Sequence, residues 1–138
     1  MPSSKTPRTA RQDLYQSFLT YWLASSFSEV SLAWDNVDFK TLGSEFVHVS
    51  SAHRSGTIAA LGNEKYRRVV IMTINIYTPE GAGQKRSDEL GEAVLGWVET
   101  FNLAGWRIRD PGYTEVGVFS GYYQSNVIAT LEYDALRT

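Results

Sequence analysis

The stretch 66–77 constrains the fold more than any other part of this chain. Its residues alternate in polarity as a β-strand does. One face is purely apolar and consists of Val70, Met72, Ile74 and Ile76. The other face is mixed, because Thr73 and Asn75 lie among its apolar residues. A strand of this kind is expected near the centre of a sheet, with its apolar face beneath helices and its mixed face partly exposed or covered by a partner.

Two stretches with helical spacing flank the strand in sequence. In the first, over residues 8–25, apolar side chains recur every four positions at Leu14, Phe18 and Trp22. The tetrapeptide at 9–12, Thr-Ala-Arg-Gln, has the form of a capping box at its start.

The second helix-like stretch runs from about residue 84 to 102, with Leu90, Val94 and Val98 on one stripe. It contains Gly91 and Gly96, each of which costs about 1 kcal/mol relative to alanine inside a helix. Close approach of the helix to the sheet, or to the other helix, is the plainest reason for both glycines.

Further strands are predicted at 30–39, 46–51, 113–120 and 126–133. The segment 52–65 has few apolar residues and is expected to form a hairpin arm with little pairing, while Gly105 and the Asp-Pro-Gly at 110–112 are turn signals. Together these elements predict an α+β fold: a two-layer sandwich of a mixed, mainly antiparallel sheet with two helices on one face. A chain of 138 residues is expected to form a single domain, here 1–138, with residues 1–7 flexible.

Composition removes several classes of function. Hydrophobic residues make up 43% and charged residues 20%, which is typical of a globular protein. The net charge of −2 does not suggest a nucleic-acid-binding surface. The absence of cysteine excludes disulfides, thiolate metal sites and cysteine nucleophiles, and it fits a reducing cytoplasm. No secretion signal or membrane-spanning segment is recognisable.

No motif for catalysis or cofactor binding is complete. The segment 81–87 lies between a strand and a helix, but Gln84 and Arg86 occupy positions where a phosphate-binding loop requires glycine and serine or threonine. His48 and His53 have no metal-ligand spacing. The segment 117–121 lacks the Gly-x-Ser-x-Gly spacing of a hydrolase. We therefore expect no enzymatic activity, no cofactor and no metal.

Three sequence segments, spread over residues 10–134, carry a resemblance to a known family. The first is Trp-Asp-Asn-Val-Asp-Phe at 34–39. The second joins Leu-Gly at 61–62 to the turn Tyr-Thr-Pro-Glu-Gly-Ala-Gly at 77–83. The third is the Gly-Tyr-Tyr at 121–123 that leads into the last strand. In this order they resemble the tail terminator, or tail completion, proteins of long-tailed bacteriophages.

The resemblance implies a structural virion protein that forms a homo-oligomeric ring, usually a hexamer. The ring would cap the tail tube, end tube polymerisation and provide the docking surface for the head connector or stopper protein. It implies a location at the head-proximal end of the tail, after assembly in the host cytoplasm. DNA would pass through the ring lumen without sequence-specific contacts, and no membrane is involved.

Two groups of opposite charge are candidates for the contacts between ring subunits. The contacts are expected to draw on the arm 52–66 and the turn 78–87. The charged candidates are Arg54, Lys65 and Arg67 on one side and Glu80, Asp88 and Glu89 on the other. Two alternatives remain open from sequence: a neighbouring head-tail joining or stopper protein, and a small cytoplasmic enzyme or ligand-binding domain.

Overall fold

The computed structural model describes residues 6–34, 45–60, 65–81, 83–119 and 121–136. These form two helices and a five-stranded sheet. The elements in chain order are α1 (Pro7–Ala24), β1 (Ser31–Trp34), β2 (Phe46–Ala60), β3 (Lys65–Pro79), α2 (Lys85–Glu99), β4 (Trp106–Phe119) and β5 (Tyr122–Leu136).

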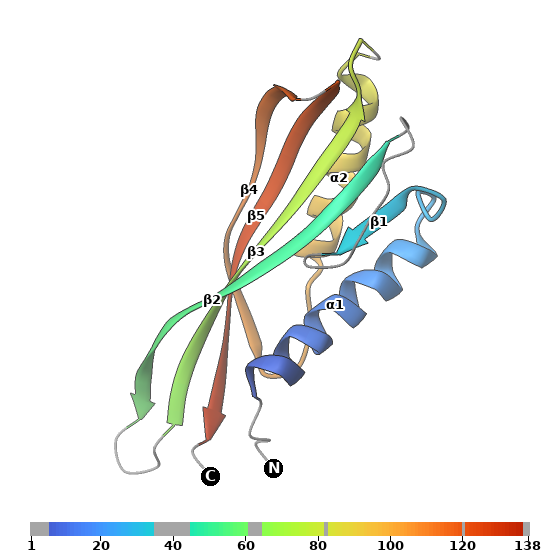
Figure 1. The fold of residues 1–138 in the computed structure, drawn as a ribbon. Coiled ribbons are helices and arrows are strands. Elements are labelled where there is room, and N and C mark those ends of the chain that lie inside the picture. Colours follow the sequence, from blue (N-terminus) through green and yellow to red (C-terminus); the bar gives the residue numbers. More distant parts are fainter. Residues whose placement is uncertain (1–5, 35–44, 61–64, 82, 120, 137–138) are drawn as a thin grey trace.

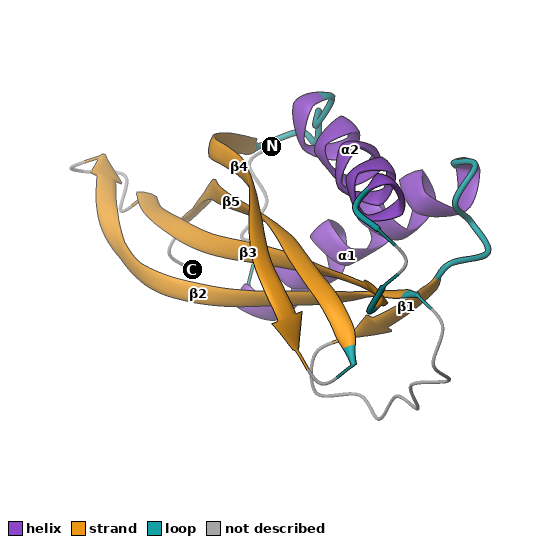
Figure 2. Ribbon diagram, turned by 90° about the horizontal axis from the view of Figure 1, so that it is seen from above, coloured by secondary structure: helices purple, strands orange, loops and turns teal. Residues whose placement is uncertain are grey.

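The sheet is mixed and β3 lies at its centre. The strand order is β1-β2-β3-β5-β4. Only β1 and β2 are parallel, and the other neighbouring strands are antiparallel. Both helices pack on the same face of the sheet, which leaves a two-layer molecule (Figures 1 and 2). This confirms the predicted fold class.

The hydrophobic core lies between the helices and the sheet. Val70, Met72, Ile74 and Ile76 are all buried, so the apolar face of β3 is the one beneath the helices. Phe18 and Trp22 from α1 and Val94 and Val98 from α2 belong to the same buried cluster. The side chains predicted to be buried together are therefore in one core.

Helix α1 begins three residues earlier than the predicted capping box. Its N-cap is Thr6, whose hydroxyl accepts a hydrogen bond from the backbone N–H of Thr9 at 3.2 Å. The Thr9 hydroxyl in turn accepts one from the backbone N–H of Thr6 at 3.0 Å. Pro7 occupies the first helical position, where its missing N–H is not needed. Residues 6 and 7 are thus part of the capped helix, whereas 1–5 lie outside the described residues.

The two glycines of α2 confirm the expected close approach. A Cβ atom on Gly91 would lie 2.3 Å from the Tyr113 ring of β4. On Gly96 it would lie 2.6 Å from the Tyr21 hydroxyl of α1. Gly91 therefore sets the distance between helix and sheet, and Gly96 sets the distance between the two helices.

Strand β2 is much longer than predicted: the segment 52–60 is an arm of the β2–β3 hairpin, as expected, but it is paired over most of its length rather than a little. Residues 52–60 continue β2 and pair with β3 up to Ala60↔Lys65, with irregularities between Arg54 and Thr57 and between Ile58 and Ala60. The lower ends of β2, β3 and β5 extend past the start of α1 (Figure 1). A strand that no helix covers needs no apolar face, which explains why hydrophobic periodicity missed this part.

One further prediction is corrected, and two others fall partly or wholly outside the described residues. The Asp-Pro-Gly at 110–112 is an irregularity within β4 where the register to β5 shifts, and Asp110 has a positive φ of 50° there. Such a bulge uses turn-forming residues without ending the strand. β1 ends at Trp34, and the rest of the predicted strand, 35–39, lies outside the described residues, as does Leu-Gly at 61–62.

Candidate interface site

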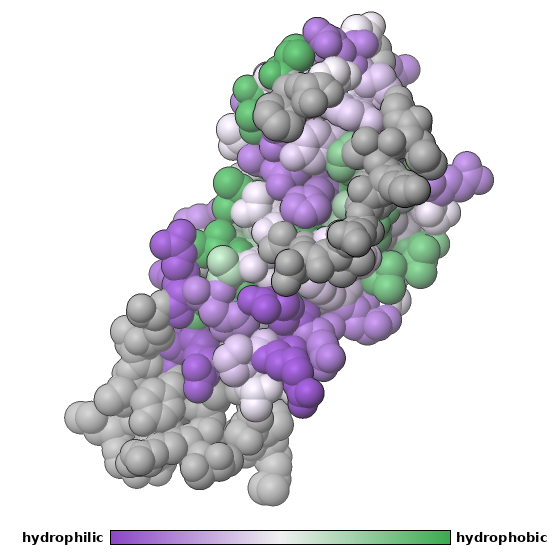
Figure 3. Space-filling model, in the orientation of Figure 1, coloured by the Kyte–Doolittle hydropathy of each residue, from purple (hydrophilic) through white to green (hydrophobic). Residues whose placement is uncertain are grey.

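Neither α1 nor α2 covers the face of the sheet that points away from the core (Figure 2). Val69 and Ile71 of β3 are half-buried there, and Ile128 of β5 is 39% exposed. In Figure 3, hydrophilic residues gather over the lower half of the described surface. We call this surface the open face; it consists of the alternate residues of β2, β3, β5 and β4 that point away from the core.

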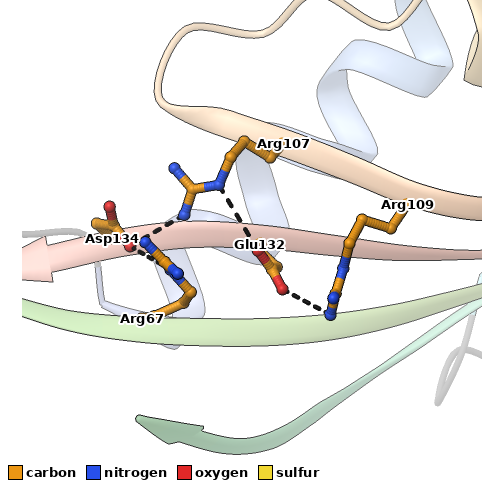
Figure 4. Close-up of polar contacts among 5 residues, drawn as sticks. All are labelled: Arg67, Arg107, Arg109, Glu132 and Asp134. Carbon is orange, nitrogen blue, oxygen red and sulfur yellow. Dashed lines mark hydrogen bonds and ion pairs between the residues drawn. The ribbon is translucent and has the colours of Figure 1, made fainter. Parts of the chain in front are cut away.

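A network of five charged side chains occupies one end of the open face (Figure 4). The Arg109 Nη2 lies 2.6 Å from Glu132 Oε1. Arg107 bridges two carboxylates, with its Nε 3.6 Å from Glu132 Oε2 and its Nη2 3.2 Å from Asp134 Oδ1. Arg67 Nε lies 3.3 Å from the same Asp134 oxygen. Three strands, β3, β5 and β4, are therefore joined by charge on this face.

The carboxylates of this network lie beneath the guanidinium groups. The side chains of Glu132 and Asp134 are 11% and 15% exposed, whereas Arg67, Arg107 and Arg109 are 42%, 47% and 57% exposed. Burial by itself raises the pKa of Asp134, but hydrogen bonds and charges from Arg107 and Arg67 outweigh it and lower that pKa below its ordinary value. The network presents arginine to the surroundings at this end of the sheet.

The other end of the open face is aromatic. The rings of Phe46 and Tyr77 stack at 4.6 Å between centroids, and Tyr122 meets Phe46 edge-on at 5.3 Å. Between the two ends, the amide of Gln124 donates a hydrogen bond to the Asn75 side chain at 3.1 Å. The open face thus changes from charged through polar to aromatic along the strands.

The six predicted interface residues form two groups at opposite ends of the molecule. The basic group lies toward the β2–β3 hairpin end of the sheet, with Arg54 in the second half of β2 and paired with Val69, and with Lys65 and Arg67 at the start of β3. The acidic group follows the far end of β3, with Glu80 in the turn and Asp88 and Glu89 in the first turns of α2. The structure therefore does not bring the two groups together within one chain.

The predicted residues differ in how far their own chain already engages them. Arg67 is held by Asp134, and Asp88 accepts a hydrogen bond from the Tyr113 hydroxyl at 3.1 Å. Arg54 and Glu80 are exposed and have no ion-pair partner among the described residues. The side chain of Lys65 lies outside the described part.

The acidic end also contains an ion pair that holds the turn in place. Arg86 donates to both oxygens of Glu45, just before β2, with its Nη2 2.6 Å from Oε1 and its Nε 2.8 Å from Oε2. Its guanidinium lies over the Phe27 ring at 5.0 Å. In the sequence, Arg86 was noted only as a mismatch to a phosphate-binding loop, whereas in the structure it fixes the start of α2 to the segment before β2.

Sequence reasoning also missed four of the five network residues. Arg107 and Arg109 are two positions apart in β4, and Glu132 and Asp134 are two positions apart in β5. This spacing places each pair on one face of its strand. The spacing of the two pairs is visible in the sequence. Only the structure shows that the two strands are neighbours and that Arg107 lies opposite Glu132.

Neither α1 nor α2 combines the length and apolarity needed to cross a membrane. Among the described residues, no three side chains of the histidine, cysteine, aspartate or glutamate type gather as metal ligands do.

Comparison with known proteins identifies a shared fold. No protein-family model and no curated protein matches the chain. The chain is similar to a solved structure whose name describes no function: the TM-score is 0.61 at 19% sequence identity, and the match covers 96% of both chains. At this identity the likeness shows the fold alone, and it extends over the whole two-layer domain.

Proposed function

We propose that this chain is a structural virion protein that forms a ring, of six subunits by the resemblance, and caps a phage tail tube. The ring would end tube polymerisation and present a docking surface to the head connector. Its partners would be other copies of itself, the tube protein and the connector. The proposal rests on the resemblance of the segments between residues 10 and 134 and on the arrangement of charge in the fold.

The separation of the two charged groups along β3 is the observation that carries the proposal. Arg54 is paired with Val69 of β3, and Val69 and Glu80 are eleven positions apart along this strand and its following turn. At about 3.3 Å per residue, this corresponds to roughly 36 Å. Groups so far apart cannot neutralise each other within one chain. They can do so between neighbouring copies, and a head-to-tail contact between two different patches is the kind that closes into a ring.

The function itself would require no bond-making step. One face of the ring would match the last ring of the tube, and the other would reject further tube subunits. Complementarity on one side and mismatch on the other is a general way to obtain such specificity. The open face, with Ile128 exposed between a charged and an aromatic end, offers a further surface for these contacts.

Charge reversal at the two unpaired residues tests the subunit contact. Arg54→Glu and Glu80→Arg should each weaken self-association in sedimentation velocity, because each places like charges at the contact. The double variant Arg54→Glu/Glu80→Arg should restore association. Both residues are exposed, so folding should change by no more than about 0.5 kcal/mol.

A matched control comes from Glu99→Arg, which reverses an exposed carboxylate at the end of α2, away from both groups. It should leave association unchanged. If neither single reversal changes self-association, the result would count against this contact. The single reversals could also abolish the ring without its being restored in the double variant. That result would place the contact elsewhere.

The functional test is removal of the protein from the phage. Tails should then be abnormally long and should fail to join to heads. Heads joined to tails of normal length would reject the proposal. Tails of normal length that stay unjoined would instead favour a head-tail joining or stopper protein. A monomer with detectable hydrolase or transferase activity would favour the small cytoplasmic enzyme or ligand-binding domain.

A further inference from the structure

A cluster of polar side chains lies on the covered side of the sheet, near the start of α1. Arg11 reaches from α1 toward β2. Its Nε donates to the Ser51 hydroxyl at 2.9 Å, and its Nη2 lies 3.4 Å from the His53 Nδ1. The Tyr15 hydroxyl lies 2.9 Å from the same Ser51 oxygen. These contacts hold the Arg11 guanidinium against the sheet.

His53 extends the cluster to β5 in a defined tautomer. Because Arg11 can only donate, the Nδ1 of His53 accepts, and the proton of the neutral ring lies on Nε2. Nε2 then donates to the Tyr133 hydroxyl at 3.1 Å. Tyr133 is fully buried, and its own hydroxyl proton finds no acceptor among the described residues. One hydrogen-bond donor is therefore unused at this point.

Arg68 adds one more buried donor beside Tyr133. The two residues are direct partners across β3 and β5. The Nε of Arg68 is buried and has no hydrogen-bond partner among the described residues. Arg11 contacts the imidazole of His53 directly, and Arg68 is the cross-strand partner of Tyr133, which His53 also contacts. The charges of both arginines lower the pKa of His53, after the larger effect of burial.

This cluster differs from the open face in lacking a counter-charge. On the open face, Arg67, Arg107 and Arg109 each contact a carboxylate. Among the described residues, none contributes a carboxylate to Arg11 or Arg68. Partly buried guanidinium groups are costly without an anion, and their planar N–H groups match the oxygens of phosphate or carboxylate.

We propose that Arg11, Arg68 and Tyr133 form a binding site for an oxyanion. The two guanidinium groups would supply charge and paired N–H donors, and the Tyr133 hydroxyl would supply one more donor. His53 is a positioning residue, since it holds Arg11 and Tyr133 on either side of its ring. The oxyanion is either a free ion such as phosphate or a carboxylate side chain of a second copy. Only the second source depends on the proposed ring.

The binding test uses inorganic phosphate and the two histidines of the chain. Phosphate added to the dilute protein should move the imidazole NMR signals of His53 in a saturable way and raise its pKa, because an anion offsets the two arginines. The signals of His48, which lies outside the cluster, should not move. Sodium chloride at the same ionic strength is the control for general screening, and an equal effect of chloride would overturn the site.

Three variants assign the binding to its residues. Arg68→Gln removes the charge but keeps most of the side-chain stem, and it should weaken phosphate binding at least 10-fold. Tyr133→Phe keeps the buried ring and should weaken it a few-fold. Arg54→Gln removes an exposed positive charge from the open face and should have no effect. Equal binding by Arg68→Gln and wild type, or equal loss in Arg54→Gln, would contradict the proposal.

A second measurement separates the two sources of the oxyanion. If a carboxylate of another copy fills the site, phosphate should weaken self-association of the wild type in sedimentation velocity, and Tyr133→Phe should weaken it as well. If the ion is free, phosphate binds and association does not change. If phosphate changes neither the His53 NMR signals nor the self-association of the wild type, the site is refuted, whatever the variants do. Saturable binding by a protein that forms no ring would keep the site and reject the ring.

Discussion

The two faces of the sheet are built from the same strands and held by different forces. On β3, Ile74 is 1% exposed beneath the helices, whereas its neighbours Thr73 and Asn75 lie half-buried on the open face. The covered face is stabilised by burial of apolar surface, which is non-directional and large. The open face is joined by ion pairs and amide contacts, which depend on geometry and contribute less.

This difference assigns the stability of the fold mainly to the covered face and the capacity to bind other molecules mainly to the open face. A core side chain is already saturated with contacts from its own chain. The open face retains exposed arginine and an exposed Ile128, so a second molecule can still gain contacts there. Changes in the apolar side chains of the covered face should therefore act on folding, and changes on the open face mainly on association.

The largest expected effect is a cavity on the covered face. Ile74→Ala should lower the free energy of unfolding by about 2–5 kcal/mol, because it empties a fully packed site. Ile71→Ala removes the same atoms from the half-buried open face and should cost clearly less. Urea unfolding followed by circular dichroism measures both. Equal losses would show that the open face is packed as tightly as the core.

A smaller loss is expected where α2 touches the sheet. Gly91→Ala would place a Cβ atom 2.3 Å from the Tyr113 ring, and overpacking of this kind costs about 1–3 kcal/mol. That cost should exceed the gain of about 1 kcal/mol in helix propensity. Gly96→Ala is the comparison, since it meets only the terminal hydroxyl of Tyr21. Thermal unfolding should rank Gly91→Ala below Gly96→Ala, and the reverse order would contradict this account of the contact.

The charged network should contribute on the order of 1 kcal/mol and should depend on pH. The folded pKa of Asp134 is lowered from its ordinary value of 3.8. Its stabilisation is therefore complete above that value and is lost as the pH falls through the lower, folded pKa. Asp134→Asn should be less stable than wild type at pH 7, and the difference should disappear in strong acid. A difference that is constant with pH would mean that the carboxylate charge is not responsible.

The smallest change in folding is expected at Ile128. Ile128→Thr keeps a β-branched side chain at a position that is 39% exposed, so the free energy of unfolding should change by less than about 1 kcal/mol. If the open face is covered in the assembly, the same change should weaken association measurably in sedimentation velocity. Unchanged association would remove this part of the open face from the proposed contacts.

Periodicity in the sequence was sufficient for the covered half of the molecule. The four-residue spacing of Leu14, Phe18 and Trp22 and the alternation around Ile74 identified one helix and the central strand. It could not find the extension of β2 to Ala60, because residues beyond the helices pair by their backbones and need no apolar face. Residue type also misled at the Asp-Pro-Gly in β4: these turn-forming residues make a bulge inside a continuous strand.

For the candidate sites, too, the sequence predicted one part and the fold decided the rest. The six charged residues proposed for the interface were chosen by type and position, and the fold decided which of them its own chain already engages. Arg67 is neutralised by Asp134, whereas Arg54 remains exposed. The contact between Arg107 and Glu132 could not be predicted from the sequence, because the two residues are 25 positions apart and meet only across paired strands.

The sequence by itself determined which faces of the helices and strands are apolar, because that depends only on residue type and on the period of the local backbone. From this followed the two layers, the central place of β3 and the side that the helices cover. The tertiary structure alone decided which polar residues meet. Register brings Arg68 beside Tyr133, and packing brings Arg11 to His53. Contacts between polar groups depend on angles and distances across different strands and helices, which no local pattern records.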